Sequence, residues 1–310
     1  MAMTLLEASK LNTGEVKRSA IIEMFAEAND LLQFVPFEDI PGGSLAYNVE
    51  GNLPGVAFRG YNEAYSESVG VVNPATEVLR IAGGDLDVDK ALIRTRGAQV
   101  RSSHEAMKVK ALALNIAGKM INGDSTSDPR EFDGLRVRVA GNQLIPALLS
   151  APSSNSPLSL EALDKAIDEV DGPQYLVTSK AVRRKLTIAG RKENIGGEIT
   201  FTQDNFGRQL TQYADLPILI ADHDDAGARI IDFDEAGPGA GSTSTSIYVC
   251  SVGDGKLVGL QNGTMEVEDL GEIDTKPVLR TRVEWLVGMA VMHGRAVARV
   301  WGITDAAVTA

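Results

Sequence analysis

The residues best suited to metal chemistry stand together at Asp222–Asp225, where the chain reads Asp-His-Asp-Asp. Carboxylate and imidazole groups are the ligands that zinc, calcium and magnesium use in proteins. Consecutive carboxylates on one loop cannot all point at one ion, however, and no complementary cluster stands out elsewhere. Asp124 and Asp128, in the polar loop 122–129, have the same weakness. We therefore predict solvated acidic turns and no metal site.

Two glycine-rich segments raise the question of phosphate binding. Gly237–Gly241 lacks the strand before it and the helix after it that a dinucleotide fingerprint needs, because the polar residues 242–246 follow. A flexible loop is favoured. Gly253–Lys256 resembles the end of a P-loop, but Cys250 replaces the first glycine and Leu257 replaces the Mg²⁺-binding hydroxyl. A tight hairpin turn explains this segment better.

The side chains that covalent or acid–base catalysis would need form no familiar motif. The three histidines, His104, His223 and His293, are far apart in sequence. Cys250 stands within the apolar run Ile247–Val252, which favours a buried structural thiol over a nucleophile. We predict no catalytic residue and no cofactor, and we expect that the protein is not an enzyme.

Composition narrows the class of protein further. The chain has 310 residues, of which 44% are hydrophobic, and this length favours roughly two domains with a sizeable core. Its net charge of -12 is opposite in sign to that of a protein whose main task is to bind the phosphate backbone of nucleic acids. The single cysteine fits a reducing compartment. The longest apolar run, Trp285–Met292, is much shorter than the about 20 residues of a membrane-spanning helix. We expect a soluble product made in the cytoplasm, with no membrane partner.

The first part of the chain contains segments that cannot form a hydrophobic core by themselves. Residues 1–40 read as an arm, with a helix predicted at Lys17–Leu32. In residues 41–85, apolar residues alternate with polar ones and a turn signal stands at Gly51–Gly55, which predicts a hairpin. An isolated two-stranded ribbon is barely stable in water, so it needs a surface to lie on, such as another subunit.

Residues 86–122 have apolar positions at helical spacing, with Gly97 as the one weak point. Between Lys90 and Met120 only Glu105 is acidic, whereas seven residues are basic: Lys90, Arg94, Arg96, Arg101, Lys108, Lys110 and Lys119. A face neutralised by acidic patches of the same or a neighbouring chain is favoured over direct DNA binding.

The rest of the chain predicts an α+β unit with a small sheet. Alternation at Leu135–Val139 predicts a half-buried strand, and residues 150–157 read as a linker. Helices are expected at Leu160–Val170 and, capped by Ser179, up to Gly190. Strands are expected at Tyr175–Thr178, Leu216–Ala221, Arg229–Phe233, Ser246–Val252, Lys256–Leu260, Met265–Glu268, Val278–Val287 and, as a strand or short helix, Ala296–Gly302.

The order of these elements resembles that of the HK97-like major capsid proteins of tailed double-stranded DNA bacteriophages. Three segments carry the resemblance. INGDSTSDPREFDGL (Ile121–Leu135) is similar to the turn after that family's spine helix. Ser159–Leu186 is similar to the opening of its axial domain, and Val278–Ile303 is similar to its C-terminal segment.

This resemblance implies an α+β HK97-like capsid fold divided into four regions. Residues 1–40 would be the N-terminal arm and 41–85 the extended β-hairpin loop. Residues 86–149 and 261–310 would form the peripheral domain, with the spine helix at 86–122. Residues 150–260 would form the axial α/β domain.

The resemblance also implies a function and partners. Pentamers and hexamers of the one chain would form an icosahedral shell, a virion capsid assembled in the host cytoplasm, around double-stranded DNA that is packaged without sequence-specific binding. A portal protein would be a partner. The arm begins almost at Met1, so a separate scaffolding protein is expected in place of a long cleaved segment.

Two groups of residues follow as interaction candidates. The basic residues Arg94, Arg96 and Arg101 are candidates for the inner face of the shell. Candidates for contacts between subunits are Phe25, Tyr47, Phe58, Arg59 and Tyr61. No lysine occurs between Lys17 and Lys90, so a lysine crosslink from the loop is impossible. Non-covalent contacts, aided if need be by a cement protein, would then hold the shell.

Two alternatives stay open. An encapsulin-type compartment shell shares the fold but is loaded with cargo enzymes, and no sequence feature separates it from a capsid. A soluble α/β enzyme, the less favoured alternative, would need to build its site from 222–225 and 237–241.

Overall fold

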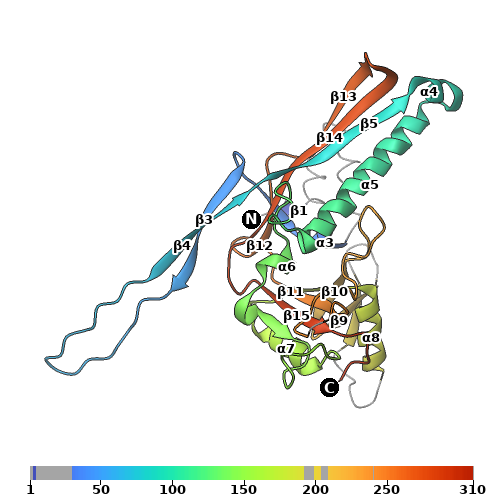
Figure 1. Cartoon of the computed structure of the whole chain (residues 1–310). Helices are drawn as coiled ribbons and strands as arrows, with labels where there is room; N and C mark the ends of the chain where they lie inside the picture. Colours follow the sequence, from blue (N-terminus) through green and yellow to red (C-terminus); the bar gives the residue numbers. More distant parts are fainter. Residues whose placement is uncertain (1–2, 5–29, 192–198, 204–208, 240, 310) are drawn as a thin grey trace.

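The computed structural model describes residues 3–4, 30–191, 199–203, 209–239 and 241–309. Figure 1 shows a body from which two projections leave in different directions, a long flap and a narrow tip of strands and helices. The predicted arm helix at Lys17–Leu32 lies outside the described residues, except that Asp30 begins helix α3 (Asp30–Phe34). Phe25, a predicted contact residue, also lies outside them.

The first sheet extends from the body to the tip. Its order is β1-β2-β12-β14-β13, and β5 pairs with β14 on the side away from β13. The bounds are β1 (Met3–Thr4), β2 (Pro36–Asp39), β5 (Arg80–Asp89), β12 (Leu257–Gln261), β13 (Glu266–Ile273) and β14 (Lys276–Val291). Strand β14 contains the predicted strand Val278–Val287 and pairs with β13 near the tip and with β12 in the body.

Helix α5 (Gln99–Asn122) lies along this sheet and contacts β5 and β14. Its buried side includes Val109, Leu112, Ile116 and Ile121, all part of the predicted apolar stripe, whereas Met107, which the same prediction included, is 66% exposed. Among the described residues, no helix is long and apolar enough to cross a lipid bilayer.

The predicted helix at 86–122 begins too early and is not continuous. Residues 86–89 belong to β5, because polar and apolar side chains alternate there as in a strand. Asp89 then caps helix α4 (Lys90–Arg96) by accepting a hydrogen bond of 2.7 Å from the Ala91 backbone N–H. Gly97 has φ +91°, a conformation that suits glycine and ends α4 before α5 begins.

The second sheet has seven strands in the order β6-β15-β11-β7-β10-β9-β8. Their bounds are β6 (Leu144–Pro146), β7 (Tyr175–Thr178), β8 (Ile199–Gln203), β9 (Gln209–Tyr213), β10 (Leu216–Ile220), β11 (Thr245–Cys250) and β15 (Val297–Ile303). Helices α7 (Leu160–Asp168) and α8 (Lys180–Gly190) pack on one face, while α3 and part of α5 pack on the other. The predicted strand at Tyr175–Thr178 and the Ser179 cap are confirmed.

Two predicted strands are absent from the fold. Leu135–Arg138 forms the single helical turn α6, followed by a 3-10 turn at Gly141–Gln143. The residue before α6, Gly134, packs tightly against the end of α5, because a Cβ there would lie 2.6 Å from the Ile121 carbonyl oxygen. In the segment predicted as the strand Arg229–Phe233, the Ile230 carbonyl instead accepts a hydrogen bond from Asn122 of α5.

The predicted hairpin turn at Gly51–Gly55 is wrong. Strand β3 (Ser44–Asn52) pairs with β4 (Val71–Val78), so residues 53–70 form a long excursion between them. The turn at Gly253–Lys256 is present, but it leads from the second sheet to the first rather than joining two paired strands. Local turn signals cannot reveal which distant strand supplies the partner.

The sheets do not follow the predicted domain boundaries. Strand β15 falls within the predicted peripheral segment 261–310 and β6 within 86–149, yet both lie in the second sheet. Strand β12 lies in the first sheet, although most of it falls within the predicted axial segment 150–260. The chain crosses between the sheets after Cys250 and returns at Val297, which the linear boundaries miss.

Candidate functional site

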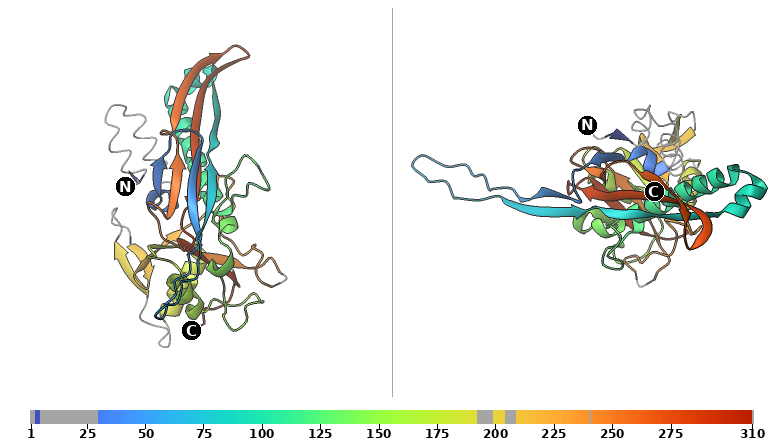
Figure 2. Two further views of the ribbon diagram at one scale, coloured as in Figure 1. Left: turned by 90° about the vertical axis from the view of Figure 1, so that its left-hand side faces the viewer. Right: turned by 90° about the horizontal axis from the view of Figure 1, so that it is seen from above.

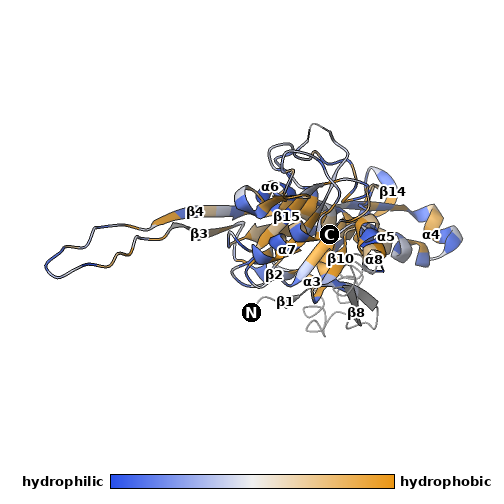
Figure 3. Cartoon of the chain, turned by 90° about the horizontal axis from the view of Figure 1, so that it is seen from below, coloured by the Kyte–Doolittle hydropathy of each residue, from blue (hydrophilic) through white to orange (hydrophobic). Residues whose placement is uncertain are grey.

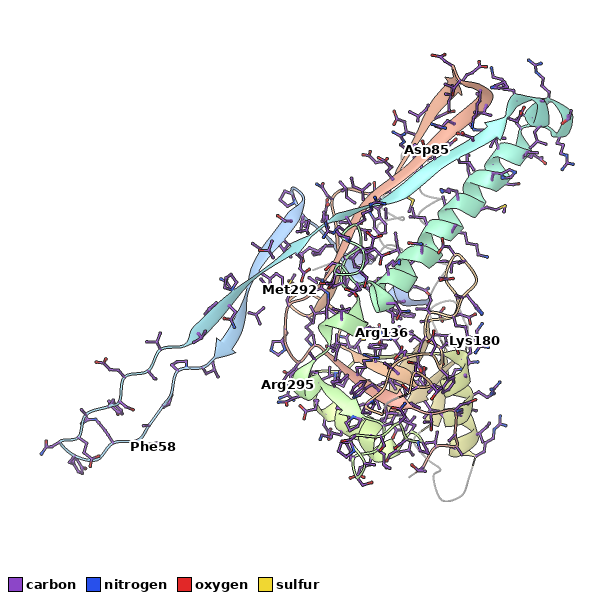
Figure 4. All side chains as sticks on the ribbon, viewed as in Figure 1. Phe58, Asp85, Arg136, Lys180, Met292 and Arg295 are labelled. Atoms are coloured by element: carbon purple, nitrogen blue, oxygen red, sulfur yellow. The ribbon has the colours of Figure 1, made fainter. Side chains whose placement is uncertain are left out.

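Side chains of the acidic turn Asp222–Asp225 contact two helices, α5 and α8. Asp225 accepts a 3.0 Å hydrogen bond from Asn115 of α5, and Asp222 pairs with Lys180 of α8, the residue labelled in Figure 4. Partial burial acts to raise the pKa of Asp222, but its contacts with Lys180 and His223 bring that pKa below the usual range. Within the described ranges no three His, Cys, Asp or Glu side chains converge as a metal site.

The glycine-rich loop at Gly237–Gly241 encloses a side chain. Asn155 accepts a 3.0 Å hydrogen bond from the Gly239 N–H and donates one of 3.2 Å to the Gly241 carbonyl. A Cβ at Gly237 would lie 2.1 Å from the Asn155 side-chain oxygen, so only glycine fits. The loop is thus filled by an asparagine of the segment predicted to be a linker.

The structure does not bring the candidate nucleophile and bases together. Cys250 is buried, and burial raises the pKa of its thiol to about 12, so the thiol is protonated near neutral pH. His223 lies 3.0 Å from Asp222 on the acidic turn. His293 lies 3.9 Å from Asp171, and His104 is exposed on α5.

The base of the flap is fixed to the body by a half-buried cluster. Arg138 of α6 pairs through two nitrogens with Glu77 of β4, and its Nε donates a hydrogen bond of 2.7 Å to the Asp133 carbonyl. The Tyr47 hydroxyl of β3 lies 3.3 Å from the Glu77 carboxylate and 3.4 Å from the Val291 carbonyl. Burial and the nearby Glu77 raise the pKa of Tyr47. This predicted contact residue therefore has partners within its own chain.

The flap itself is the segment 53–70 together with the ribbon β3–β4. It stands away from the body in Figure 1 and in the right-hand view of Figure 2. The relative exposure of Phe58 is 106% and that of Tyr61 is 103%, as in an extended peptide with no neighbour. Large apolar side chains outside any core usually mark an interaction surface. Sequence reasoning missed further exposed flap residues: Leu53, Val56, Tyr65 and Val69.

The end of the flap has some internal order. Glu63 accepts a 2.8 Å hydrogen bond from the Gly60 N–H, and its carbonyl accepts one of 3.1 Å from Arg59. The Arg59 guanidinium lies 5.2 Å from the centre of the Tyr65 ring. These contacts shape the turn but cover none of Phe58 or Tyr61.

The tip is strongly charged. Arg280 and Arg282 of β14 bind Asp87 and Asp85 of β5 through paired hydrogen bonds of 2.6–3.1 Å. These bonds lower the pKa of both carboxyls. Figure 4 shows Asp85 on this exposed surface. The alternation of each strand is visible in the sequence, but the pairing depends on the strand register.

The basic segment is partly neutralised within the chain. Arg101 binds Glu105 at 3.1 Å and Asp269 at 2.6 Å, and Lys90 pairs with Glu272. Arg94 and Arg96, in the last turn of α4, are exposed and form no ion pair with any described residue; Lys90 and Arg101, by contrast, both reach acids of β13.

Comparison with known proteins finds similar sequences and folds. Residues 13–148 match the family model described as major capsid protein GP7. No curated protein matches the chain.

Solved structures resemble the chain over most of its length. The holo-SrpI encapsulin complex from Synechococcus elongatus PCC 7942 has a TM-score of 0.64 at 16% identity, covering 90% of this chain and 89% of that chain. The capsid of a native GTA particle has a TM-score of 0.60 at 13% identity, covering 89% of this chain and 90% of that chain. A chain of Mycobacterium phage Bobi has 0.60 at 11% identity, covering 91% of both. The structures show that the chain has the fold of HK97-like shell proteins, and the family match over residues 13–148 supports a capsid shell protein.

Proposed function

We propose that this chain assembles with copies of itself into pentamers and hexamers that close an icosahedral virion shell around packaged double-stranded DNA. The observation that carries the proposal is the flap, which holds Phe58 and Tyr61 in solvent although their burial is worth about 1.5–3 kcal/mol for a large apolar side chain. A neighbouring copy would cover them. Repeated small contacts of this kind make a closed shell stable.

The parts of the fold receive matching roles in this proposal. The flap is the extended loop, the first sheet with α5 is the peripheral domain, and the second sheet with α7 and α8 is the axial domain. Phe58, Arg59 and Tyr61 contact a neighbouring subunit. Phe25 and Tyr47 stay contact candidates, although Tyr47 is already engaged with Glu77.

The charge of the chain suits a container for DNA. A net charge of -12 disfavours tight binding of the genome, which would hinder its release. Assembly takes place in the host cytoplasm, with a portal protein, a separate scaffolding protein and, where the particle needs it, a cement protein as further partners.

The test is expression of the full chain with and without its co-encoded candidate partners. Sedimentation and negative-stain microscopy should show closed particles with five- and six-fold units. Boiling in detergent should release monomers of 33.0 kDa, because the flap contains no lysine for crosslinking. A chain that stays a monomer beside these partners would refute the proposal.

A compartment shell is the second candidate, and the likeness to the SrpI encapsulin favours it. The contents of purified particles separate the two functions. Nuclease-protected genomic DNA inside the particles supports the capsid, whereas a co-purified cargo protein without protected DNA supports the compartment.

A further inference from the structure

The two sides of the tip carry opposite charge. Strand β13 reads Glu-Val-Glu-Asp-Leu-Gly-Glu-Ile, and it lies at the outer edge of the first sheet, where β14 is its partner. Helix α4 lies at the same end of the molecule, on the β5 side (Figure 1). It carries Lys90, Arg94 and Arg96 and no acidic residue.

The chain itself pairs only part of these charges. Lys90 at the start of α4 and Arg101 at the start of α5 reach Glu272 and Asp269 of β13. Arg94 and Arg96 lie in the last turn of α4, before the break at Gly97, and point to solvent.

On the acidic side, Glu266, Glu268 and Asp274 are exposed and form no ion pair with the described residues. Glu268 lies opposite Arg282 in the β13–β14 pair, without an ion pair between them, so its carboxylate is only partly compensated. The tip therefore shows a basic corner and an acidic edge at once, and the exposed residues Arg94, Arg96, Glu266 and Glu268 form no ion pair among the described residues.

We propose that Arg94 and Arg96 of one copy bind Glu266 and Glu268 of a neighbouring copy, an inference that rests on the proposed shell function. The contact joins two different surfaces of the same chain. Such a heterologous contact generates a ring when its rotation closes, so each tip would give its basic corner to one neighbour and its acidic edge to another. Guanidinium groups bind carboxylates through paired hydrogen bonds, as Arg280 and Arg282 already do within the tip.

Two competing roles for these residues lead to different outcomes. Carboxylates on an edge strand can serve only to prevent pairing with other strands. Exposed arginines can contact packaged DNA instead of protein. In either case the two sets of residues would act independently of each other, whereas the proposed contact couples them.

The experiment is a charge exchange in the full chain. R94E/R96E and E266K/E268K each place like charges together, and each is expected to lower the yield of closed particles at least about tenfold, since like-charge contacts across an interface cost several kcal/mol. The combined fourfold variant restores opposite charges with the signs exchanged. Its yield should return to within about threefold of the unaltered chain.

Matched controls keep the result specific. K165E/R184E reverses two exposed cations of α7 and α8, and E161K/D168K reverses two exposed acids of α7; both should leave the yield within about threefold. R94Q/R96Q removes the charge without repulsion and should give an intermediate yield. Circular dichroism of unassembled protein confirms that each variant is folded.

The outcomes separate the contact from the shell function. If the unaltered chain forms no particles, the proposed function fails before the contact is tested. If the unaltered chain forms particles, and the yield of the fourfold variant falls by as much as the losses of the two double variants combined, the proposed contact is wrong. Normal yield with less DNA in R94E/R96E particles also overturns the contact, because it assigns the arginines to the genome.

Discussion

The flap and strand β11 contain similar side chains in opposite surroundings. Every residue of β11 is buried, and its Tyr248 has no exposed surface, whereas Tyr61 of the flap is fully exposed. In Figure 3 the hydrophobic colour concentrates on strands of the second sheet such as β10 and β15. The second sheet therefore stabilises itself through layers on both faces. The flap has no second layer, and its apolar residues gain burial only from another molecule.

The largest effect is expected when the flap is shortened. Residues 53–70 can be replaced by Asn-Gly, because Asn52 and Val71 are paired and a two-residue turn can join them. The thermal unfolding midpoint of the unassembled chain should stay within a few degrees, since these residues contribute nothing to the core. Particles should disappear in sedimentation velocity runs.

The double variant F58S/Y61S is the milder companion to this change. It keeps the length of the flap and should reduce assembly without changing unfolding. Normal particles from the shortened chain would show that the flap is dispensable.

A change in the second sheet should have the reverse effect. Arg299 is buried and binds Glu235 at 2.6 Å and Ser246 at 2.9 Å. Its guanidinium lies 5.6 Å from the centre of the Tyr248 ring and 6.0 Å from that of Trp301. Arg299→Met strands the Glu235 carboxylate in the interior and should cost about 3–5 kcal/mol of unfolding free energy in urea titrations.

The matched control for this change removes both charges. E235Q/R299M should recover a large part of the loss, because no unpaired charge is then buried. Equal losses in the single and double variants would mean that the packing of the arginine, and not its charge, stabilises the sheet.

A change at the junction should have an intermediate effect. Glu77→Gln weakens the contact with Arg138 and should lower stability by about 1–3 kcal/mol, the range for a buried polar group left unsatisfied. Hydrogen exchange should quicken in β3 and β4 and stay slow in β11. Faster exchange in both regions would contradict a local anchor.

The smallest effect concerns pH. Hydrogen bonds from Ser127 and the Thr126 backbone lower the pKa of Asp124 from 3.8 to about 2 in the folded chain. The carboxylate therefore stabilises the fold above a pH of about 3.8, and this contribution is lost as the pH falls toward 2. The difference in unfolding free energy between the unaltered chain and Asp124→Asn should be small at neutral pH and vanish in acid. A difference that grows in acid would have the wrong sign.

Much of the second sheet could be predicted from the sequence, because its signals are local. The apolar spacing of α7, the Ser179 cap and the short run Tyr175–Thr178 each act within a few residues. The strand predicted at Leu135–Val139 was wrong because the signal is local there too. One helical turn is too short for its period to be distinguished from that of a strand.

The charged tip could not be predicted in the same way. The basic segment was evident, but Arg101 finds its partners Thr281 and Asp269 in a strand pair more than 160 residues away. Strand register decides such contacts, and a single sequence does not encode it locally. Phe58 and Tyr61 lie on the projecting flap, in the excursion that the predicted turn at Gly51–Gly55 missed, and their contact with a neighbouring subunit stays a prediction. The internal engagement of Tyr47 depends on Val291, far along the chain.

The buried Cys250 gives the chain a built-in probe of how often the second sheet opens. Its thiol is the only one in the sequence, and it sits in a strand whose every residue is shielded. A thiol reagent can reach it only when the second sheet opens. The rate at which it is labelled in free chains and in finished particles would thus measure how often a subunit opens. A cysteine introduced on the flap could be labelled with a dye while Cys250 stays unreacted.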